Sequence, residues 1–162
     1  MSAAPLSDDA RARIDRELRK YPDDQRQSAV MSALAIVQAE HGHLTDALME
    51  AVAEHIGMPP VAVMEVASFY TMYDLAPGGR HKLCLCTNLP CALSGALDAA
   101  EHLKKRLGVD WNGTSADGQF TLKEGECFGA CGDAPVIIVD NRRMHVGMDA
   151  ARIDALLAEL AR

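Results

Sequence analysis

The stretch GECFGACGDAPV, residues 125–136, places two cysteines four residues apart among glycines and then enters an apolar segment. The stretch CTNLPC, residues 86–91, holds an earlier pair. The two pairs have the spacings C-x3-C, for Cys127 and Cys131, and C-x4-C, for Cys86 and Cys91. If both pairs serve one site, the fold of this half of the chain must bring their two loops together.

The segments that flank the pairs predict a strand, a helix and a second strand. Residues 82–86 suit a short strand that ends at the first pair, and residues 136–139 suit a buried strand directly after the second. Between them a helix is expected over residues 93–107, with apolar positions at Leu93, Leu97, Ala100, Leu103 and Leu107. In a compact βα…β unit both cysteine loops lie at one end of the sheet, so four thiolates can meet there.

Two more strands and a last helix complete this half of the chain. Residues 119–122 and 144–146 are predicted strands, and the second of them can pair with residues 136–139 across a polar turn. The chain ends in a predicted helix with Ile153, Leu156, Leu157 and Leu160 on one face. Pro135 is a candidate for a cis peptide bond. This order predicts a thioredoxin-like layer of strands with helices packed on it.

The first half of the chain predicts helices only. The first covers residues 8–20 and the second runs from Asp23 or Asp24 to Gly42. The third is capped by Thr45 and ends at Gly57, and the fourth begins at Pro59-Pro60 and carries an apolar stripe that ends at Tyr70.

A stretch without this periodicity, APGG at residues 76–79, separates the two halves and predicts a linker. The fold class expected is therefore α+β, with a helical bundle over residues 1–76 and a thioredoxin-like domain over residues 80–162. The helical bundle is also a candidate docking surface for a partner protein.

Composition excludes several classes of function. The 162-residue chain has a formal net charge of -7 and no run of lysine or arginine longer than three residues, so nucleic acid is not an expected partner. Its apolar runs are far shorter than the roughly 20 residues that cross a bilayer, so no direct membrane insertion is expected. The N-terminus lacks the apolar core of a signal peptide, which predicts a cytoplasmic protein.

Five cysteines in a reducing compartment favour metal or redox chemistry over structural disulfides. Two close pairs suit a 2Fe-2S cluster, in which each iron takes two thiolates. Structural zinc, which also accepts four cysteines, and chemically inert buried thiols remain open as alternatives. A thioredoxin-like dithiol would need C-x-x-C, and none of the six histidines lies in a cysteine loop as a Rieske-type centre requires. Cys84 is expected to be a small buried apolar residue, and the histidines to be surface or satisfied residues.

Four stretches of the chain carry a family resemblance. They are YPDDQRQSAVMSALAIVQAEHG, VAVMEVASFYTMY, CTNLPCALSGALDAAEHL and FTLKEGECFGACGDAPV. In these stretches the chain resembles the thioredoxin-like 2Fe-2S subunits of bacterial NADH:quinone oxidoreductase, respiratory complex I, from about Tyr21 to the last helix. Ser68, where threonine is frequent in the family, is a small departure outside the cysteine motifs.

The resemblance implies a cofactor and partners. Residue by residue, it implies that Cys86, Cys91, Cys127 and Cys131 bind one 2Fe-2S cluster, whereas Cys84 matches no ligand position. It further implies a flavoprotein partner that binds FMN and NADH, other iron-sulfur subunits, and a place in the peripheral arm on the cytoplasmic side of the inner membrane. The chain itself has no G-x-G-x-x-G fingerprint, as expected for a carrier beside another subunit's active site.

Three other assignments remain open. Related subunits occur in NAD-reducing hydrogenases and in NAD-dependent formate dehydrogenases. From a different class, a zinc-stabilised scaffold without redox function is also compatible with four cysteines.

Overall fold

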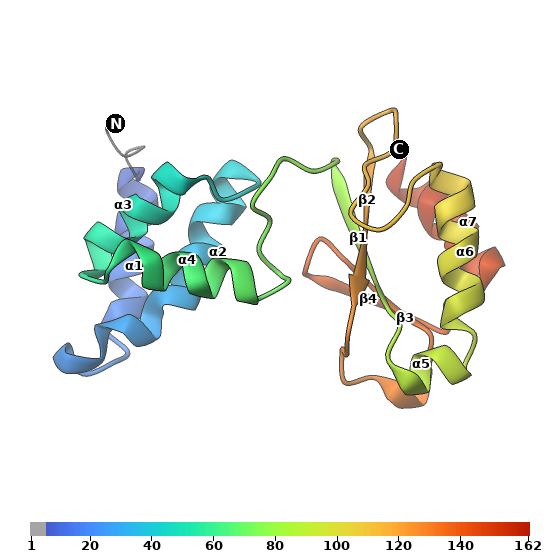
Figure 1. Ribbon diagram of the computed structural model, residues 1–162, viewed down its shortest axis with the longest axis horizontal. Coiled ribbons are helices and arrows are strands. Elements are labelled where there is room, and N and C mark those ends of the chain that lie inside the picture. Colours follow the sequence, from blue (N-terminus) through green and yellow to red (C-terminus); the bar gives the residue numbers. More distant parts are fainter. Residues whose placement is uncertain (1–5) are drawn as a thin grey trace. The chain divides into compact units, whose positions relative to one another are not determined.

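The structure, a computed structural model, describes residues 6–162 and divides into two compact units (Figure 1). One unit ends at Pro77, and the other comprises Gly78–Arg162. The first is built from helices alone, and the second contains the sheet. The predicted α+β fold class is therefore confirmed. No helix in residues 6–162 is long and apolar enough to cross a membrane.

The described part of the helical unit contains four α-helices, and several of their ends lie at the predicted capping residues. They are α1 (Asp8–Leu18), α2 (Val30–His41), α3 (Asp46–Ile56) and α4 (Pro60–Phe69). The Thr45 hydroxyl accepts a hydrogen bond from the Leu48 N–H at 3.3 Å, as its predicted capping role requires. Gly42 and Gly57 adopt left-handed conformations at the ends of α2 and α3, also as predicted.

Two details of the helices predicted for the first half of the chain are wrong. The segment Asp23–Ala29 is a 3-10 helix, η1, rather than the first turns of α2. Within it Gln25 leaves the helical region, with φ -119° and ψ 25°. The next residue, Arg26, donates from Nε to the Ile56 carbonyl at 3.1 Å and from a terminal nitrogen to the His55 carbonyl at 3.3 Å, at the end of α3. These bonds hold η1 against α3 and away from the line of α2.

The apolar stripe of α4 also stops earlier than predicted. The helix ends at Phe69, and Tyr70 has extended backbone angles. The Tyr70 residue is 40% exposed and makes an edge-to-face contact with the Phe69 ring. Val63 and Ala67 are the buried residues of this helix. Because Tyr70 lies outside the helix, it is not on the same helical face as Val63, and the predicted apolar stripe ends before it.

The core of the helical unit is closed by a tyrosine that follows α4. Fully buried apolar side chains from all four helices form the centre, among them Ile14, Leu34, Val52 and Val63. Tyr73 is buried beside them, and its hydroxyl donates to the Met31 carbonyl at 2.8 Å. Burial raises the pKa of Tyr73 to about 12. The chain after α4 is thus anchored on α2 through a neutral phenol.

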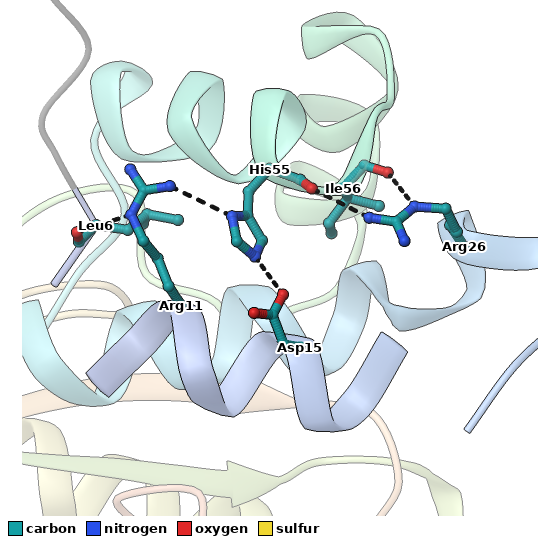
Figure 2. Close-up of polar contacts among 6 residues, drawn as sticks. All are labelled: Leu6, Arg11, Asp15, Arg26, His55 and Ile56. Carbon is teal, nitrogen blue, oxygen red and sulfur yellow. Dashed lines mark hydrogen bonds and ion pairs between the residues drawn. The ribbon is translucent and has the colours of Figure 1, made fainter. Parts of the chain in front are cut away.

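His55 links α3 to α1 (Figure 2). Its Nε2 lies 2.8 Å from the Asp15 carboxylate, and Arg11 donates to its Nδ1 at 3.4 Å. Both ring nitrogens therefore have partners, which agrees with the prediction that this histidine is satisfied rather than a ligand. With Arg26 on the far side of the same helix end, α3 is tied to both neighbouring elements.

The second unit is a four-stranded sheet in the order β2-β1-β3-β4. The strands are β1 (His81–Cys86), β2 (Phe120–Gly125), β3 (Val136–Val139) and β4 (Arg143–Val146). β1 pairs in parallel with β2, while β3 pairs antiparallel with both β1 and β4. The helices are α5 (Leu89–Leu93), α6 (Ala96–Leu107) and α7 (Ala150–Leu160), with a short 3-10 turn, η2, at Cys131–Asp133. Figure 1 shows α6 and α7 together on one side of the sheet.

The core lies between the sheet and these two helices. Leu83, Leu85, Leu122 and Ile137 from the strands meet Leu103 of α6 and Ile153 of α7, all almost fully buried. Ile153, Leu156 and Leu157 are buried as predicted for the last helix. The Ala134–Pro135 peptide bond is cis, which confirms the candidate named from the sequence.

The predicted helix over residues 93–107 is two helices. Gly95, with φ 97°, separates α5 from α6. Because the helix axis restarts there, the buried face of α6 is formed by Ala96, Ala99, Ala100 and Leu103. Leu93 and Leu97, which were predicted to face the core, are 80% and 59% exposed.

The predicted linker, residues 76–79, does not lie wholly between the two units, because Gly78 and Gly79 pack along β2. The Gly79 N–H donates to the Thr121 hydroxyl at 2.6 Å. A Cβ atom on Gly79 would lie 2.8 Å from the backbone nitrogen of Phe120, so no larger residue fits without movement. Gly78 and Gly79 therefore belong to the second unit.

Replacing Tyr73 by phenylalanine should lower stability and change its pH dependence. The variant loses the hydrogen bond to Met31, at a cost of about 1 kcal/mol. In the wild type the unfolded chain releases the phenolic proton near pH 10, whereas the folded chain holds it to about pH 12. The folded state binds more protons in this window, so stability falls as pH rises through it.

Urea unfolding at pH 9 and pH 11, with absorbance titration at 295 nm, measures both effects. Tyr73→Phe should show a smaller loss of stability between these pH values than the wild type. Tyr21→Phe, a change at a residue 37% exposed, is the control. An unchanged titration curve in Tyr73→Phe above pH 10 would contradict the assignment.

Replacing His55 by alanine should destabilise the helical unit by about 1 kcal/mol, because Asp15 and Arg11 lose their shared partner. His41→Ala is the matched control, since the nearest charged partner of His41 is Glu40 at 3.9 Å. Urea midpoints compare the two variants. Equal midpoints for His55→Ala and wild type would show that the link between α1 and α3 contributes nothing.

Candidate metal centre

The four cysteines of the two motifs lie where the parallel strands β1 and β2 end. Cys86 is the last residue of β1, opposite Gly125, the last residue of β2. The first loop then enters α5, which carries Cys91, and the second carries Cys127 before reaching Cys131 at the start of η2. Parallel pairing puts both strand ends at the same edge of the sheet, so the sequence prediction of a common end is correct.

All four cysteines line one cavity of about 180 Å³. Asn88, Pro90, Phe128 and Val136 complete much of its wall, and no histidine of residues 6–162 lines it. The cavity is much larger than the about 10–15 Å³ that a single water needs. Four sulfur donors around a space of this size fit an iron-sulfur cluster, which is held by cysteine thiolates.

The two pairs differ in exposure. Cys86 and Cys91 are 3% and 2% exposed and belong to an apolar cluster with Ala96 and Val136. Cys127 and Cys131 are exposed. The site therefore has a closed side, formed by β1 and α5, and an open side, formed by the second loop.

Local hydrogen bonds hold the two loops to each other. The Cys86 thiol donates to the Glu126 carbonyl at 3.4 Å, and the Thr87 hydroxyl donates to the Glu124 carboxylate at 2.7 Å. Within the first loop, the Asn88 side chain accepts from the Leu89 N–H at 2.7 Å and caps α5. The spacing of the cysteines does not predict the first two bonds, because each joins residues 37 or more positions apart in the sequence that only the fold brings together.

Burial raises the pKa of the Cys91 thiol, and the hydrogen bond with the Cys86 sulfur raises it further. A backbone hydrogen bond from Val136 acts in the opposite direction. Without a metal, this thiol is held neutral. Binding of a metal at the site must therefore displace the proton, since the thiolate is the metal-ligating form.

Among residues 6–162, no group of three or more His, Cys, Asp or Glu side chains is arranged to hold a single metal ion. None of the five cysteines forms a disulfide.

Cys84 was predicted to be buried, and this prediction is wrong. It is half-buried, between the fully buried Leu83 and Leu85. Because side chains alternate along a strand, Leu83 and Leu85 face α6 and α7, and Cys84 faces the opposite side of the sheet. It does not line the cavity.

The histidines outside the helical unit are mostly satisfied, as expected. His81 contacts Asp140 at 2.9 Å, and His102 contacts Asp154 at 3.0 Å. His145 differs, because within the described residues its buried Nε2 has no hydrogen-bond partner. Its pairing with Ile137 turns it toward the side of the sheet that α7 covers.

Fold and site together define a class of small α+β proteins with four thiols in paired loops at one end of a thioredoxin-like sheet. Residues 14–161 match the family model described as thioredoxin-like 2Fe-2S ferredoxin. The chain belongs to this family.

Relatives of known name support the same assignment. The chain is 46% identical over 147 residues to a subunit of the NADH-quinone oxidoreductase of Rhizobium meliloti, and the alignment covers 91% of this chain and 86% of that protein. It is 37% identical over 153 residues to NADH-quinone oxidoreductase subunit 2 of Thermus thermophilus, where the alignment covers 94% and 84%. The resemblance inferred from the sequence is confirmed.

A solved structure of a NAD+-reducing NiFe-hydrogenase in the H2-reduced state is similar with a TM-score of 0.67 and 23% sequence identity. The alignment covers 79% of this chain and 22% of that chain. At this identity the likeness shows a shared fold.

Cys127→Ser should lose the cluster or change its spectrum, whereas Cys84→Ser should retain it. Cys127 lines the cavity and Cys84 does not. Iron and acid-labile sulfide content, with visible and EPR spectra of the reduced protein, compare the two variants. Loss of the cluster in Cys84→Ser alone would show that the ligand assignment is wrong.

Proposed function

We propose that this chain is the electron-transfer subunit of an NADH-quinone oxidoreductase and binds one 2Fe-2S cluster through Cys86, Cys91, Cys127 and Cys131. The observation that carries the proposal is the single cavity lined by all four cysteines in a chain of the thioredoxin-like 2Fe-2S ferredoxin family. The names of relatives that match over most of their length support the parent complex.

The chain's own residues provide the surroundings that such a cluster needs. When bound, a 2Fe-2S cluster exchanges one electron at a time. Cys86 and Cys91 supply two thiols from the closed side, where Ala96 and Val136 keep water away. Exclusion of water on this side lowers the local dielectric, which is one of the determinants of reduction potential.

The open side gives an electron partner access to the site. Cys127 and Cys131 are exposed there. NADH delivers a hydride, which carries two electrons, so a flavin must stand between NADH and a one-electron carrier. We propose that the partner is the FMN- and NADH-binding flavoprotein subunit of the complex, with further iron-sulfur subunits beyond it. This chain alone does not form a complete active site.

The proposal extends to domains and location. The division between Pro77 and Gly78 supports two domains, a helical bundle and a ferredoxin domain, close to the predicted bounds of 1–76 and 80–162. We also propose, from the family resemblance, that the chain lies in the peripheral arm of the complex on the cytoplasmic side of the membrane; the names of the relatives support only the parent complex.

A second candidate is the equivalent subunit of a NAD-reducing hydrogenase, which the hydrogenase fold match favours. Purification of the tagged chain with its native partners separates the two. NADH oxidation that depends on quinone supports the first assignment, and hydrogen-dependent reduction of NAD+ supports the second.

The isolated chain tests the cofactor. Anaerobically purified protein should contain about two irons and two acid-labile sulfides per chain, and should give a rhombic EPR signal only after reduction with dithionite. A colourless protein that contains zinc and no sulfide, even after anaerobic cluster reconstitution, would exclude the 2Fe-2S cluster. The zinc-stabilised scaffold would then be the remaining function.

A further inference from the structure

The loop that carries Cys127 folds back onto the end of β2. Gly125 closes β2, and the ring of Phe128, three residues later, occupies the space where a side chain at position 125 would lie. A Cβ atom on Gly125 would overlap Phe128 Cζ and would lie 3.0 Å from Phe128 Cε1. It would also be 3.0 Å from the Cys84 sulfur. The Phe128 ring therefore needs a glycine at position 125, and the Cys84 sulfur lies beside the same space.

The placement of the ring follows from the alternation of side chains along β2. Phe120 and Leu122 face the core under α6 and α7, so Thr121, Lys123 and Gly125 face the other side of the sheet. The loop after Gly125 must turn back over this side for Phe128 to reach it. Gly129, with φ 73°, supplies a left-handed residue directly after Phe128.

The same ring also lines the cysteine cavity. Phe128 packs against the buried cluster that includes Cys86, Cys91 and Val136. It therefore touches β2 at one edge and the closed side of the site at the other. Cys127 is its covalent neighbour, so the position of the ring limits where the Cys127 sulfur can lie.

We propose that Gly125 and Phe128 are a positioning pair that sets the place of Cys127 in the four-cysteine site and shields the buried thiols of Cys86 and Cys91. The proposal rests on the proposed function in that the site is taken to hold a 2Fe-2S cluster. It assigns a role to two residues that are not ligands, and it explains why a glycine ends β2.

The test uses the full-length chain with its cluster bound, and it enlarges residue 125 and then reduces residue 128. Gly125→Ala introduces a methyl group that collides with the ring, so the loop must move, and cluster loss to a chelator should become about tenfold faster. The EPR line shape of the reduced protein should also change. Leucine lacks the Cζ and Cε1 atoms that collide, so Phe128→Leu added to Gly125→Ala should restore most of both properties.

Gly132→Ala is the matched control. Gly132 follows Cys131, does not have a positive φ, and offers open space to a methyl group, which would have no heavy atom within 4 Å apart from those of Gly132 and its two chain neighbours. This variant should match wild type in EPR line shape and in the rate of cluster loss. Thermal unfolding of all variants separates a local effect on the site from a loss of fold. Wild-type behaviour of Gly125→Ala, or no recovery in the double variant, overturns the proposal.

A second readout needs no cluster. In metal-free full-length chain, Phe128→Ala should speed alkylation of Cys86 and Cys91 by about tenfold, because the ring no longer covers them. Mass spectrometry assigns the modified residues, and Gly132→Ala is again the control. If wild type binds no cluster but this acceleration is seen, the proposed function fails and the shielding role of Phe128 stands. Without the acceleration, the shielding role is wrong.

Discussion

The parallel pairing of β1 with β2, in the register that sets Cys86 opposite Gly125, is the constraint on which the candidate site depends. It brings two loops far apart in the sequence to one edge of the sheet. β3 then starts from that same edge and runs back antiparallel beside β1, so the chain after Cys131 closes the site instead of leaving it. A shift of one residue in the β1–β2 register would turn Cys86 to the other side of the strand. The burial of Leu83 and Leu85 against α6 and α7 opposes such a shift.

Much of this arrangement could be predicted from the sequence, because the deciding signals are local. Thr45 and Gly57 mark the ends of α3 through backbone preferences that do not need the rest of the fold. The grouping of the cysteines followed from two motifs on either side of a predicted strand and helix. Their placement around one cavity agrees with that prediction, although binding of a cluster by them stays a proposal.

The errors arose where a distant contact or a backbone break decides the outcome. Leucines at the spacing of Leu93 and Leu97 suggest a buried face, but the left-handed Gly95 starts a new helix with a different face toward the sheet. Cys84 was expected to be buried because cysteines usually are, yet its exposure depends on which face of the sheet the helices cover. The fit of Phe128 on Gly125 joins two residues of one motif only after the loop has folded back, and no periodicity signals it.

The unequal burial of the two cysteine pairs has a consequence for the chain on its own. The opening beside Cys127 and Cys131, where we propose that an electron partner approaches, is equally accessible to oxygen and chelators when that surface is uncovered. A partner surface seated over that opening would act as the missing wall of the site. If the cysteines bind a cluster as proposed, the lifetime of that cluster would depend on the partner as well as on this chain.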